Sequence, residues 1–399
     1  MSAPSALEAR RSYAGPALLS YGFRPFFLAA GLWAGFGILL WLPQYFGLLA
    51  LPTRFGALDW HIHEMLYGYV AATVAGFLLT AIPNWTGRLP VNGNALALLA
   101  ALWLAGRLAI LFSQWIGAPL AAVIDIAFLV TLAGFAAREI VSGKNWRNLR
   151  VLAMVSVLIV GNVVFHVEVA LTGAANYGIR IGIAAMIMLI SLVGGRIVPS
   201  FTNNWLTQNN PGRKPVKFGR FDIVTMAASA IALLAWIALG GHPVTGALLL
   251  AAGLLHAVRL ARWAGDRTLG ERLVLVLHVA YAFIPVGFLL LGASMFSADL
   301  VPSAGIHAWT AGAIGMMTVA VMTRATLGHT GQPLHANFLT QAVYGCVFLS
   351  AVLRICAAVS GSADLLDVSG VFWIAGFGLF AIGYWNLLVF NRPAWEARC

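Results

Sequence analysis

The chain has 399 residues, of which 61% are hydrophobic and only 9% are charged, and its mean hydropathy is +0.87. Soluble globular domains are about half apolar and about a quarter charged, so this composition excludes a water-soluble fold. Three cysteines, Cys346, Cys356 and Cys399, show no CxxC spacing, so neither a disulfide framework nor a thiolate metal site is indicated. Any metal would therefore have to be held by histidine.

The N-terminal 25 residues are predicted to be a cytoplasmic tail. They contain Arg10, Arg11 and Arg24 but no compact apolar core followed by a small-residue cleavage site, so they do not read as a signal peptide. We expect a single transmembrane domain over residues 26–390 and a second cytoplasmic tail over residues 391–399.

Twelve apolar runs follow in chain order, each bounded by Pro, Gly, Asn or basic clusters. About 20 apolar residues are enough for a helix to cross a bilayer, so each run predicts a spanning helix. The runs are 26–49, 60–83, 94–113, 117–138, 149–171, 177–198, 219–240, 243–263, 272–293, 303–325, 338–359 and 368–390. The predicted fold class is an all-α polytopic membrane protein.

The positions of Lys and Arg support this segmentation and predict an orientation. With the N-terminus inside, 20 of the 24 basic residues fall on the cytoplasmic side, and only Arg54 and Arg180 fall outside. Arg107 and Arg354 lie within predicted spans. A shift by one helix would destroy the asymmetry, so both termini are predicted to be cytoplasmic. The net charge of +11 then reflects topology, and no separate basic domain favours nucleic-acid binding.

An internal repeat joins two distant segments, His63–Pro90 and His307–Leu334, which align without gaps. Each begins with His, has Gly five residues later, and reaches Thr-Gly at the same offset. The matched positions are Gly68 with Gly312, and Thr86-Gly87 with Thr330-Gly331. A weaker third copy begins at Ile179. The related helices are the second, sixth and tenth, which predicts a pseudo-threefold repeat of four-helix units.

Ionisable side chains inside the spans fall into layers. Such groups are costly in hydrocarbon, so each is a functional hypothesis, and a rise of about 1.5 Å per residue gives its depth. The outer layer contains His61, His63, His166, His307, Glu64 and Glu168, with Asp125 somewhat deeper. His256 and His278 share a deeper layer, and His329 lies near the inner mouth.

Imidazole binds haem iron and copper while neutral, so two layers of histidine admit two metal centres. A lone His in a span is more often a hydrogen-bonding or proton-path residue. His61 and His63 are two apart and would point about 200° apart, so they cannot both bind one metal on a regular helix. Glu64 or Glu168 could orient a ligating His. Arg107 and Arg354 could pair with haem propionates or with Asp125, or serve as snorkelling or ion-paired residues.

Several motifs then carry a family resemblance. They are Tyr21-Gly22-Phe23-Arg24-Pro25-Phe26-Phe27-Leu28, Trp60-His61-Ile62-His63-Glu64-Met65, Pro83-Asn84-Trp85-Thr86-Gly87, Gly195-Arg196-x-x-Pro199-Ser200-Phe201-Thr202-Asn203 and Arg324-Ala325-x-x-Gly328-His329-Thr330-Gly331. Together they resemble the NnrS family from the first helix to about residue 335. The resemblance implies a twelve-helix bacterial inner-membrane protein that contains haem and copper and is associated with denitrification and protection from nitric oxide. It assigns no individual metal ligand.

The combined hypothesis is a haem- and copper-containing redox protein that reduces nitric oxide. His63 and His307 would hold an outer b-type haem, with His61 or His166 near copper, and His256 and His278 would form the deeper centre. Cofactor-binding roles are also expected for Arg107 and Arg354, and a metal role for His329. Glu64, Glu168 or Asp125 would relay protons. Electrons would come from a periplasmic or quinol donor.

Two other classes of function remain open from the sequence. One is a transporter or channel for a metal or small anion, in which repeats and buried charges serve alternating access. The other is a protein that binds or senses nitric oxide without turnover. The architecture is also similar to that of haem–copper oxidases and nitric oxide reductases, but their adjacent His pair is absent here.

Overall fold

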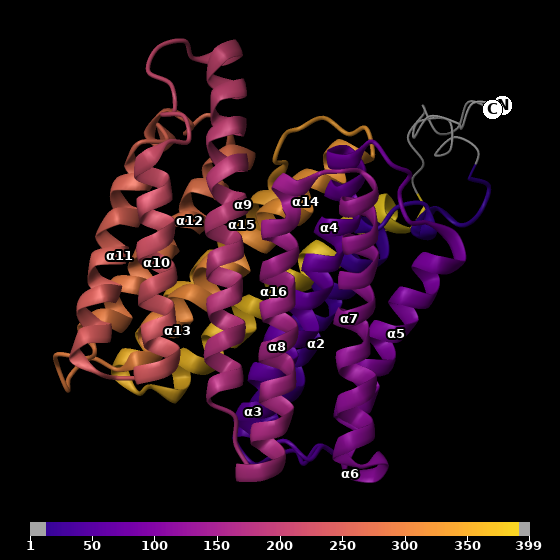
Figure 1. Ribbon diagram of the computed structural model, residues 1–399, viewed down its shortest axis with the longest axis vertical. Coiled ribbons are helices and arrows are strands. Elements are labelled where there is room, and N and C mark those ends of the chain that lie inside the picture. Colours follow the sequence, from indigo (N-terminus) through magenta and orange to yellow (C-terminus); the bar gives the residue numbers. More distant parts are fainter. Residues whose placement is uncertain (1–12, 391–399) are drawn as a thin grey trace. The chain divides into compact units, whose positions relative to one another are not determined.

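A computed structural model describes residues 13–390 of the protein, which are helical with no strand among them (Figure 1). Twelve helices in this range are long and apolar enough to cross a membrane. The predicted fold class is therefore confirmed, and the protein is a multi-pass membrane protein. The predicted tails fall largely on residues 1–12 and 391–399, which lie outside the described range.

The helices match the predicted runs closely. Those in the first half are α2 (Phe23–Tyr45), Ala57–Thr86, α5 (Gly93–Leu111), α7 (Ala118–Ser142), α8 (Leu149–Thr172) and α9 (Tyr177–Asn209). Those in the second half are α10 (Arg220–Leu239), α11 (Pro243–Ala261), α12 (Arg272–Ala293), Pro302–His329, α15 (Phe338–Ser360) and α16 (Ala363–Val389). Most ends differ from the predicted ones by only a few residues.

The largest difference lies in α9, which continues to Asn209 where the sequence predicted an end at 198. The predicted end rested on Pro199, which lies inside the helix. Proline removes one backbone hydrogen bond and can kink a helix without ending it. α9 continues through Pro199, as α12 does through Pro285.

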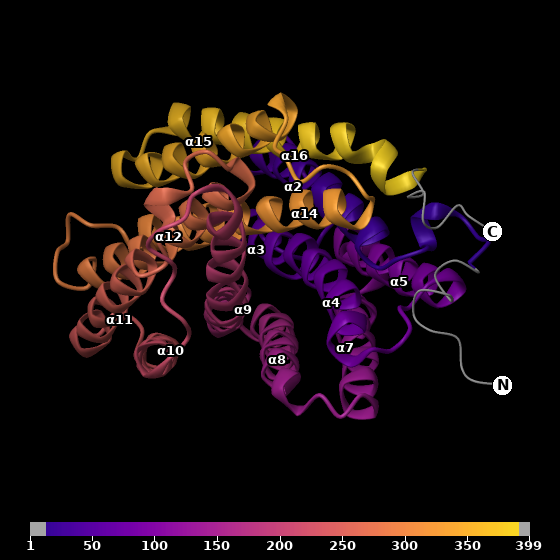
Figure 2. The ribbon, with the colours of Figure 1, turned by 90° about the horizontal axis from the view of Figure 1, so that it is seen from above.

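The helices form two compact units. Unit 1 comprises the chain through Gly182 together with Met322–Leu334 and the part from Phe377, and unit 2 comprises Ile183–Val321 and His335–Gly376. In unit 1, α7 packs against α5 and α8. In unit 2, α11 lies between α10 and α12, as Figure 2 shows. The prediction of a single transmembrane domain stays a prediction.

Both copies of the aligned repeat contain a wide helical turn at the same point. The second spanning helix consists of α3 (Ala57–His63), a π-helical segment η2 (Glu64–Tyr69) and α4 (Val70–Thr86). The tenth consists of α13 (Pro302–His307), a π-helical segment η5 (Ala308–Gly315) and α14 (Met316–His329). Each π segment begins directly after the aligned histidine. π-helical segments are rare in proteins, and those that occur often lie at functional sites. Among the described residues α9, the expected third copy, has no π segment, so the threefold repeat stays a prediction.

The repeated glycines have a physical reason. Gly87 and Gly331 have φ values of 69° and 71°, a left-handed conformation that glycine adopts without strain and that ends a helix. Gly68 and Gly312 instead allow close packing. A Cβ on Gly68 would lie 2.7 Å from Nη1 of Arg107, and a Cβ on Gly312 would overlap the ring of Phe283.

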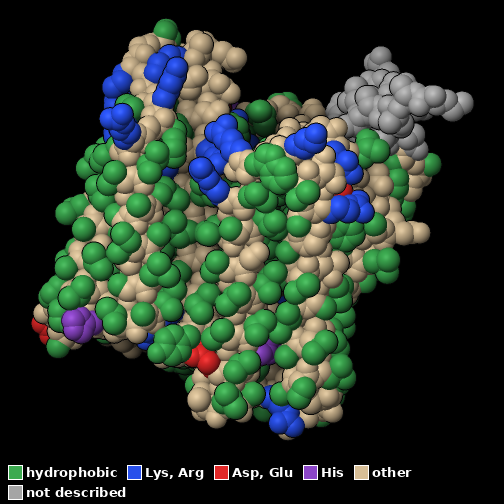
Figure 3. Space-filling model, viewed as in Figure 1, with side chains coloured by type: hydrophobic (Ala, Val, Ile, Leu, Met, Phe, Trp, Pro, Cys, Tyr) green, Lys and Arg blue, Asp and Glu red, His purple; other side chains and the backbone are tan. Residues whose placement is uncertain are grey.

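The surface of unit 2 shows where lipid and water are expected. Apolar side chains such as Leu234 are exposed along its helices, at 64% for this residue. The loop between α9 and α10 carries Arg213, Lys214 and Lys217, and Figure 3 shows Lys and Arg side chains gathered at this end of the unit. This distribution is typical of a membrane protein with a basic loop at the water interface.

Replacing Gly312 tests the packing of the second π segment. Gly312→Ala should lower the free energy of unfolding by about 1–3 kcal/mol, because the added methyl group collides with Phe283. Gly345→Ala is the control, since Gly345 lies in α15 with nothing within 4 Å of its Cβ position, and we expect it to raise stability by about 0.4–1 kcal/mol. Thermal or denaturant unfolding in detergent measures both. Equal stability of the two variants would contradict the packing argument.

Candidate metal centre

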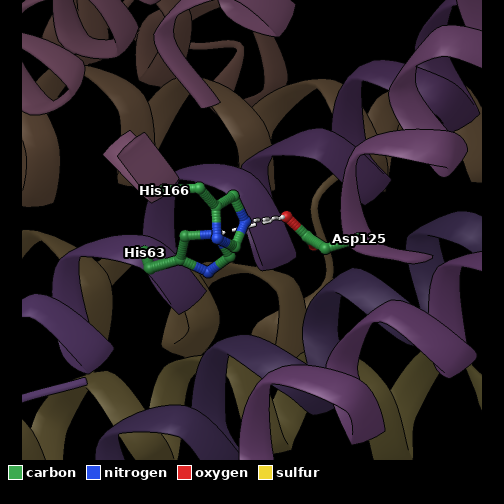
Figure 4. Close-up of side chains that lie close together, drawn as sticks. All are labelled: His63, Asp125 and His166. Atoms are coloured by element: carbon green, nitrogen blue, oxygen red, sulfur yellow. Dashed lines mark hydrogen bonds and ion pairs between the residues drawn. The ribbon is translucent and has the colours of Figure 1, made fainter. Parts of the chain in front are cut away.

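Three side chains from three helices converge inside unit 1. His63 is the last residue of α3, Asp125 lies in the first third of α7, and His166 lies in the last third of α8. Figure 4 shows both imidazole rings directed at the carboxylate of Asp125. One donor atom from each residue lies within 4.8 Å of the other two. His63 is 0% exposed, Asp125 is 1% exposed and His166 is 9% exposed, so the cluster is shielded from water.

The Oδ2 atom of Asp125 is the centre of this cluster. It lies 3.2 Å from Nε2 of His63 and 3.0 Å from Nε2 of His166. Asn162 donates a hydrogen bond of 2.8 Å from Nδ2 to the same oxygen. Asn162 and His166 are four residues apart on α8, so they share one face of that helix. A single carboxylate oxygen thus brings three side chains together.

The atoms around His63 favour a cation at its Nε2. Its Nδ1–H donates to Oε1 of Glu64 over 3.0 Å, because a carboxylate only accepts. Its Nε2 faces two oxygens, Oδ1 of Asn162 at 3.1 Å and Oδ2 of Asp125. Since Asn162 uses its amide nitrogen on Asp125, that oxygen also only accepts. A bare lone pair would be repelled there, so Nε2 carries either a proton or a metal ion.

The distances from the two imidazole nitrogens to Asp125 fit one shared metal ion. Bonds from metals to His nitrogen and carboxylate oxygen are about 2.0–2.2 Å, which places neighbouring ligands about 2.8–3.6 Å apart. The distances of 3.0 Å and 3.2 Å to Asp125 lie in that range. Two imidazoles and one carboxylate form a ligand set that suits iron and other transition metals. A carboxylate on the second nitrogen of a ligating His, as Glu64 is here, is also typical of metal sites.

A buried ion-pair network holds these ligands in place. Arg107, on α5, donates to Oε1 of Glu64 over 2.7 Å and to Oδ1 of Asp125. The other carboxylate oxygen of Glu64 accepts a hydrogen bond of 2.7 Å from Nε1 of Trp33. Gly68 faces this group with no side chain of its own, which leaves room for Arg107 and Trp33. Two carboxylates and one guanidinium leave a net charge of −1 when both histidines are neutral, which favours a bound cation.

Aromatic rings enclose the cluster. The ring of Phe55 lies 5.1 Å from that of His63 and 5.6 Å from that of His166, measured between centroids. Phe165 lies 5.1 Å from His63 on another side. The hydroxyl of Tyr67 is turned to the carbonyl of Gly178 and leaves its ring against His63. The rings exclude water and strengthen every charge interaction inside.

Two predicted residues of the outer layer lie apart from this cluster. His61 stacks on Trp41, with the ring centroids 4.0 Å apart, which agrees with the expectation that it points away from His63. Glu168 accepts hydrogen bonds of 2.8–2.9 Å from the backbone N–H groups of residues 176–178 at the start of α9. Its observed contacts are those of a helix cap, and its predicted role in proton transfer stays a prediction.

His307 lies in unit 2, and one of its two ring nitrogens is engaged in a hydrogen bond. Its Nδ1–H donates to the carbonyl of Ser303 over 2.7 Å, so in the neutral ring Nε2 carries the lone pair. Arg354 lies near enough to act on it electrostatically. A backbone carbonyl on Nδ1 is a usual arrangement for a metal-ligating His.

The predicted deeper pair has separate partners in unit 2. His256 is 0% exposed, and its two nitrogens contact Ser229 and Tyr281. His278 contacts Thr202 through Nε2 over 2.8 Å. His256 and His278 share no hydrogen-bond partner, and a deeper metal centre stays a prediction. In unit 1, His329 packs against the rings of Tyr21 and Phe23, and its metal role likewise stays a prediction.

Sequence reasoning missed several residues of these clusters. Asn162 gave no signal beyond its spacing of four from His166. Arg259 was counted among the cytoplasmic charges, yet it is 0% exposed within α11 and paired with Asp222 over 2.9 Å. Its spacing of three from His256 places both on one helix face and could have indicated this.

Removing the charge of Arg107 tests whether the network holds the site together. Arg107→Met should lower the free energy of unfolding by about 3–5 kcal/mol, because Glu64 and Asp125 would be left buried without their counter-charge. Arg213→Met breaks the exposed pair with Asp266 and should cost about 0–1 kcal/mol. Unfolding in detergent measures both variants. A loss for Arg107→Met no larger than the control would show that the buried network contributes little.

Comparison with known proteins agrees with the sequence motifs. A family described as NnrS protein matches residues 17–392, which is nearly the whole chain. No curated protein matches the sequence. Membership of this family points to a role in processes that involve nitric oxide and to the binding of haem or another metal. On the extent of this match, the chain belongs to the NnrS family.

Proposed function

We propose that the protein is a haem- and metal-containing membrane redox protein that reduces nitric oxide. The observation that carries the proposal is the convergence of His63, His166 and Asp125 in a buried cluster where Nε2 of His63 faces only acceptor atoms. This arrangement supports a resident metal ion, iron or copper by its ligand set. Such an ion would supply a binding site for nitric oxide and a one-electron carrier.

The protein's own residues would set the geometry of the site. Glu64 holds Nδ1–H of His63 and thereby directs Nε2 at the shared position. Arg107 fixes the carboxylate of Asp125 through its other oxygen, which leaves Oδ2 for the metal. Phe55 and Phe165 exclude water. Nitric oxide is small and uncharged, so it can enter from the lipid without a polar channel.

The three carboxylates have different roles in the proposed reaction. Reduction of two nitric oxide molecules to nitrous oxide and water consumes two electrons and two protons. Asp125 serves as a ligand in this scheme, and Glu168 binds backbone amides at the start of α9. Glu64 is then the carboxylate that remains as the candidate proton carrier beside the site.

His307 is proposed to hold the iron of a b-type haem in unit 2. Its Nδ1–H is held by Ser303, which leaves Nε2 for iron. Arg354, within electrostatic reach of His307, is suited to pair with a haem propionate. The haem would supply an electron reservoir.

The cellular setting belongs to the same proposal. The asymmetry of Lys and Arg supports both termini on the cytoplasmic side of a bacterial inner membrane. Cytoplasmic termini would place His63 and His166 toward the periplasm. Electrons would come from a periplasmic or quinol donor.

Metal content and nitric oxide consumption test the site in unit 1. His63→Ala, His166→Ala and Asp125→Asn should each lower metal content by at least about tenfold, since ligands act together. His335→Ala is the control, because His335 lies in an exposed loop. Elemental analysis of purified protein gives the metal, and a nitric oxide electrode with a reductant gives the rate.

The same measurements separate the competing functions. Loss of metal together with loss of nitric oxide consumption supports the proposal. One equivalent of nitric oxide bound without further consumption would show a binding protein rather than a reductase. Unchanged metal content in all three variants would overturn the site.

Haem content tests His307 separately. His307→Ala should abolish most of the haem absorbance of the purified protein, because alanine has no nitrogen that could bind the iron in place of Nε2. His335→Ala is the control and should retain the absorbance. The reduced-minus-oxidised visible spectrum measures the effect. Full haem content in the His307→Ala protein would exclude His307 as the ligand.

A further inference from the structure

Unit 2 contains a buried chain of hydrogen bonds that the proposed function does not use. It joins Arg259, Tyr281, His256 and Ser229, from helices α10, α11 and α12. Each of these four side chains is 0% exposed. The proton positions along this chain follow from which of its atoms can only donate and which can only accept.

The direction of each hydrogen bond follows from one fixed end. The hydroxyl of Ser229 donates to the carbonyl of Thr225 over 2.7 Å, since a carbonyl only accepts. Its oxygen must then accept from Nε2–H of His256, at 2.8 Å. The neutral imidazole therefore has its lone pair on Nδ1, which accepts the phenolic proton of Tyr281 over 2.9 Å.

The phenol oxygen is held from its other side by a cation. Arg259 donates from Nη1 to the hydroxyl oxygen of Tyr281 over 2.8 Å and to the carbonyl of Ser191 over 3.0 Å. Its Nε binds Asp222 over 2.9 Å, so the charge of the guanidinium is compensated. The hydroxyl hydrogen of Tyr281 therefore points to Nδ1 of His256 in the hydrogen bond of 2.9 Å.

Two aromatic contacts hold the pair rigid. The ring of His256 stacks on Phe288, with centroids 5.3 Å apart and planes at 14°. The ring of Tyr281 meets Trp263 edge to face, with centroids 4.5 Å apart. Neither ring can turn without losing these contacts, so the phenol and its base stay aligned.

We propose that Tyr281 and His256 form a redox-active pair, in which one-electron oxidation of the phenol moves its proton to Nδ1 of His256. The O–H bond of Tyr281 breaks, an N–H bond forms on His256, and the electron leaves to a one-electron oxidant. The products are a neutral tyrosyl radical and an imidazolium that still donates to Ser229. Return of an electron from a reductant returns the proton along the same hydrogen bond.

The oxidant class that fits this position is a small neutral radical such as nitrogen dioxide, which forms where nitric oxide meets dioxygen. Such a molecule can enter the hydrocarbon region without a polar channel. It takes up the electron and becomes nitrite, so the step balances: phenol, imidazole and nitrogen dioxide give phenoxyl radical, imidazolium and nitrite. The pair would intercept an oxidising radical inside the membrane protein, independently of the metal site in unit 1.

Electron paramagnetic resonance of the full-length protein tests the pair. Nitrogen dioxide is generated in a pulse by one-electron oxidation of nitrite, and the sample is frozen. The unaltered protein should give a tyrosyl signal, and Tyr281→Phe should lose most of it. Tyr21→Phe is the matched control, because Tyr21 is also buried but donates to a backbone carbonyl, that of Thr80, which cannot take up a proton.

A second variant separates the base from the hydrogen bond. His256→Gln can still accept from the phenol but cannot take its proton, so the radical yield should fall several-fold. Where a variant folds poorly, the g-values of the signal in unaltered protein, with tyrosine deuterated to identify it, report whether the radical oxygen is hydrogen-bonded as Tyr281 is. A signal unchanged in Tyr281→Phe, an equal yield in His256→Gln, or g-values of an unbonded phenoxyl would each overturn the assignment.

Discussion

The contact between the guanidinium of Arg107 and the carboxylates of Glu64 and Asp125 is the interaction on which unit 1 depends. A charge buried in a membrane protein must be compensated at close range, because lipid supplies no water to do so. This one side chain satisfies two carboxylates, and those carboxylates in turn direct the rings of His63 and His166. The positions of His63, Asp125 and His166 follow from that compensation.

Unit 2 also contains a buried arginine whose charge is compensated, but its other contacts differ from those of Arg107. Arg259 is buried beside Asp222, as Arg107 is beside Asp125. Its Nη1 donates to Tyr281 and to a backbone carbonyl, and the neighbouring His256 accepts a hydrogen bond from the phenol, where His63 faces acceptors. The same pair of charge types thus prepares one imidazole for a cation and the other for a proton. The difference lies in the third partner rather than in the ion pair.

The sequence predicted the twelve helices well because hydropathy and helix length are governed by the bilayer, which acts on each segment separately. Depth along a helix also placed His63, Glu64 and His166 in one layer with Asp125 somewhat deeper, and the structure brings these four side chains together. Lateral pairing is a different matter, since it depends on which helix faces are in contact. Asn162 could not be predicted for that reason, and for Arg259 only its spacing from His256 was informative.

The π-helical segments that follow His63 and His307 set the rotational phase of each helix. A π turn accommodates one residue more than an α turn, and one residue corresponds to about 100° around a helix axis. The residues that precede each π segment are therefore rotated by that angle relative to the rest of the same helix. One residue more or less in a π segment would thus change the direction of the imidazole that precedes it. The faces of the helix that pack against neighbouring helices would stay where they are.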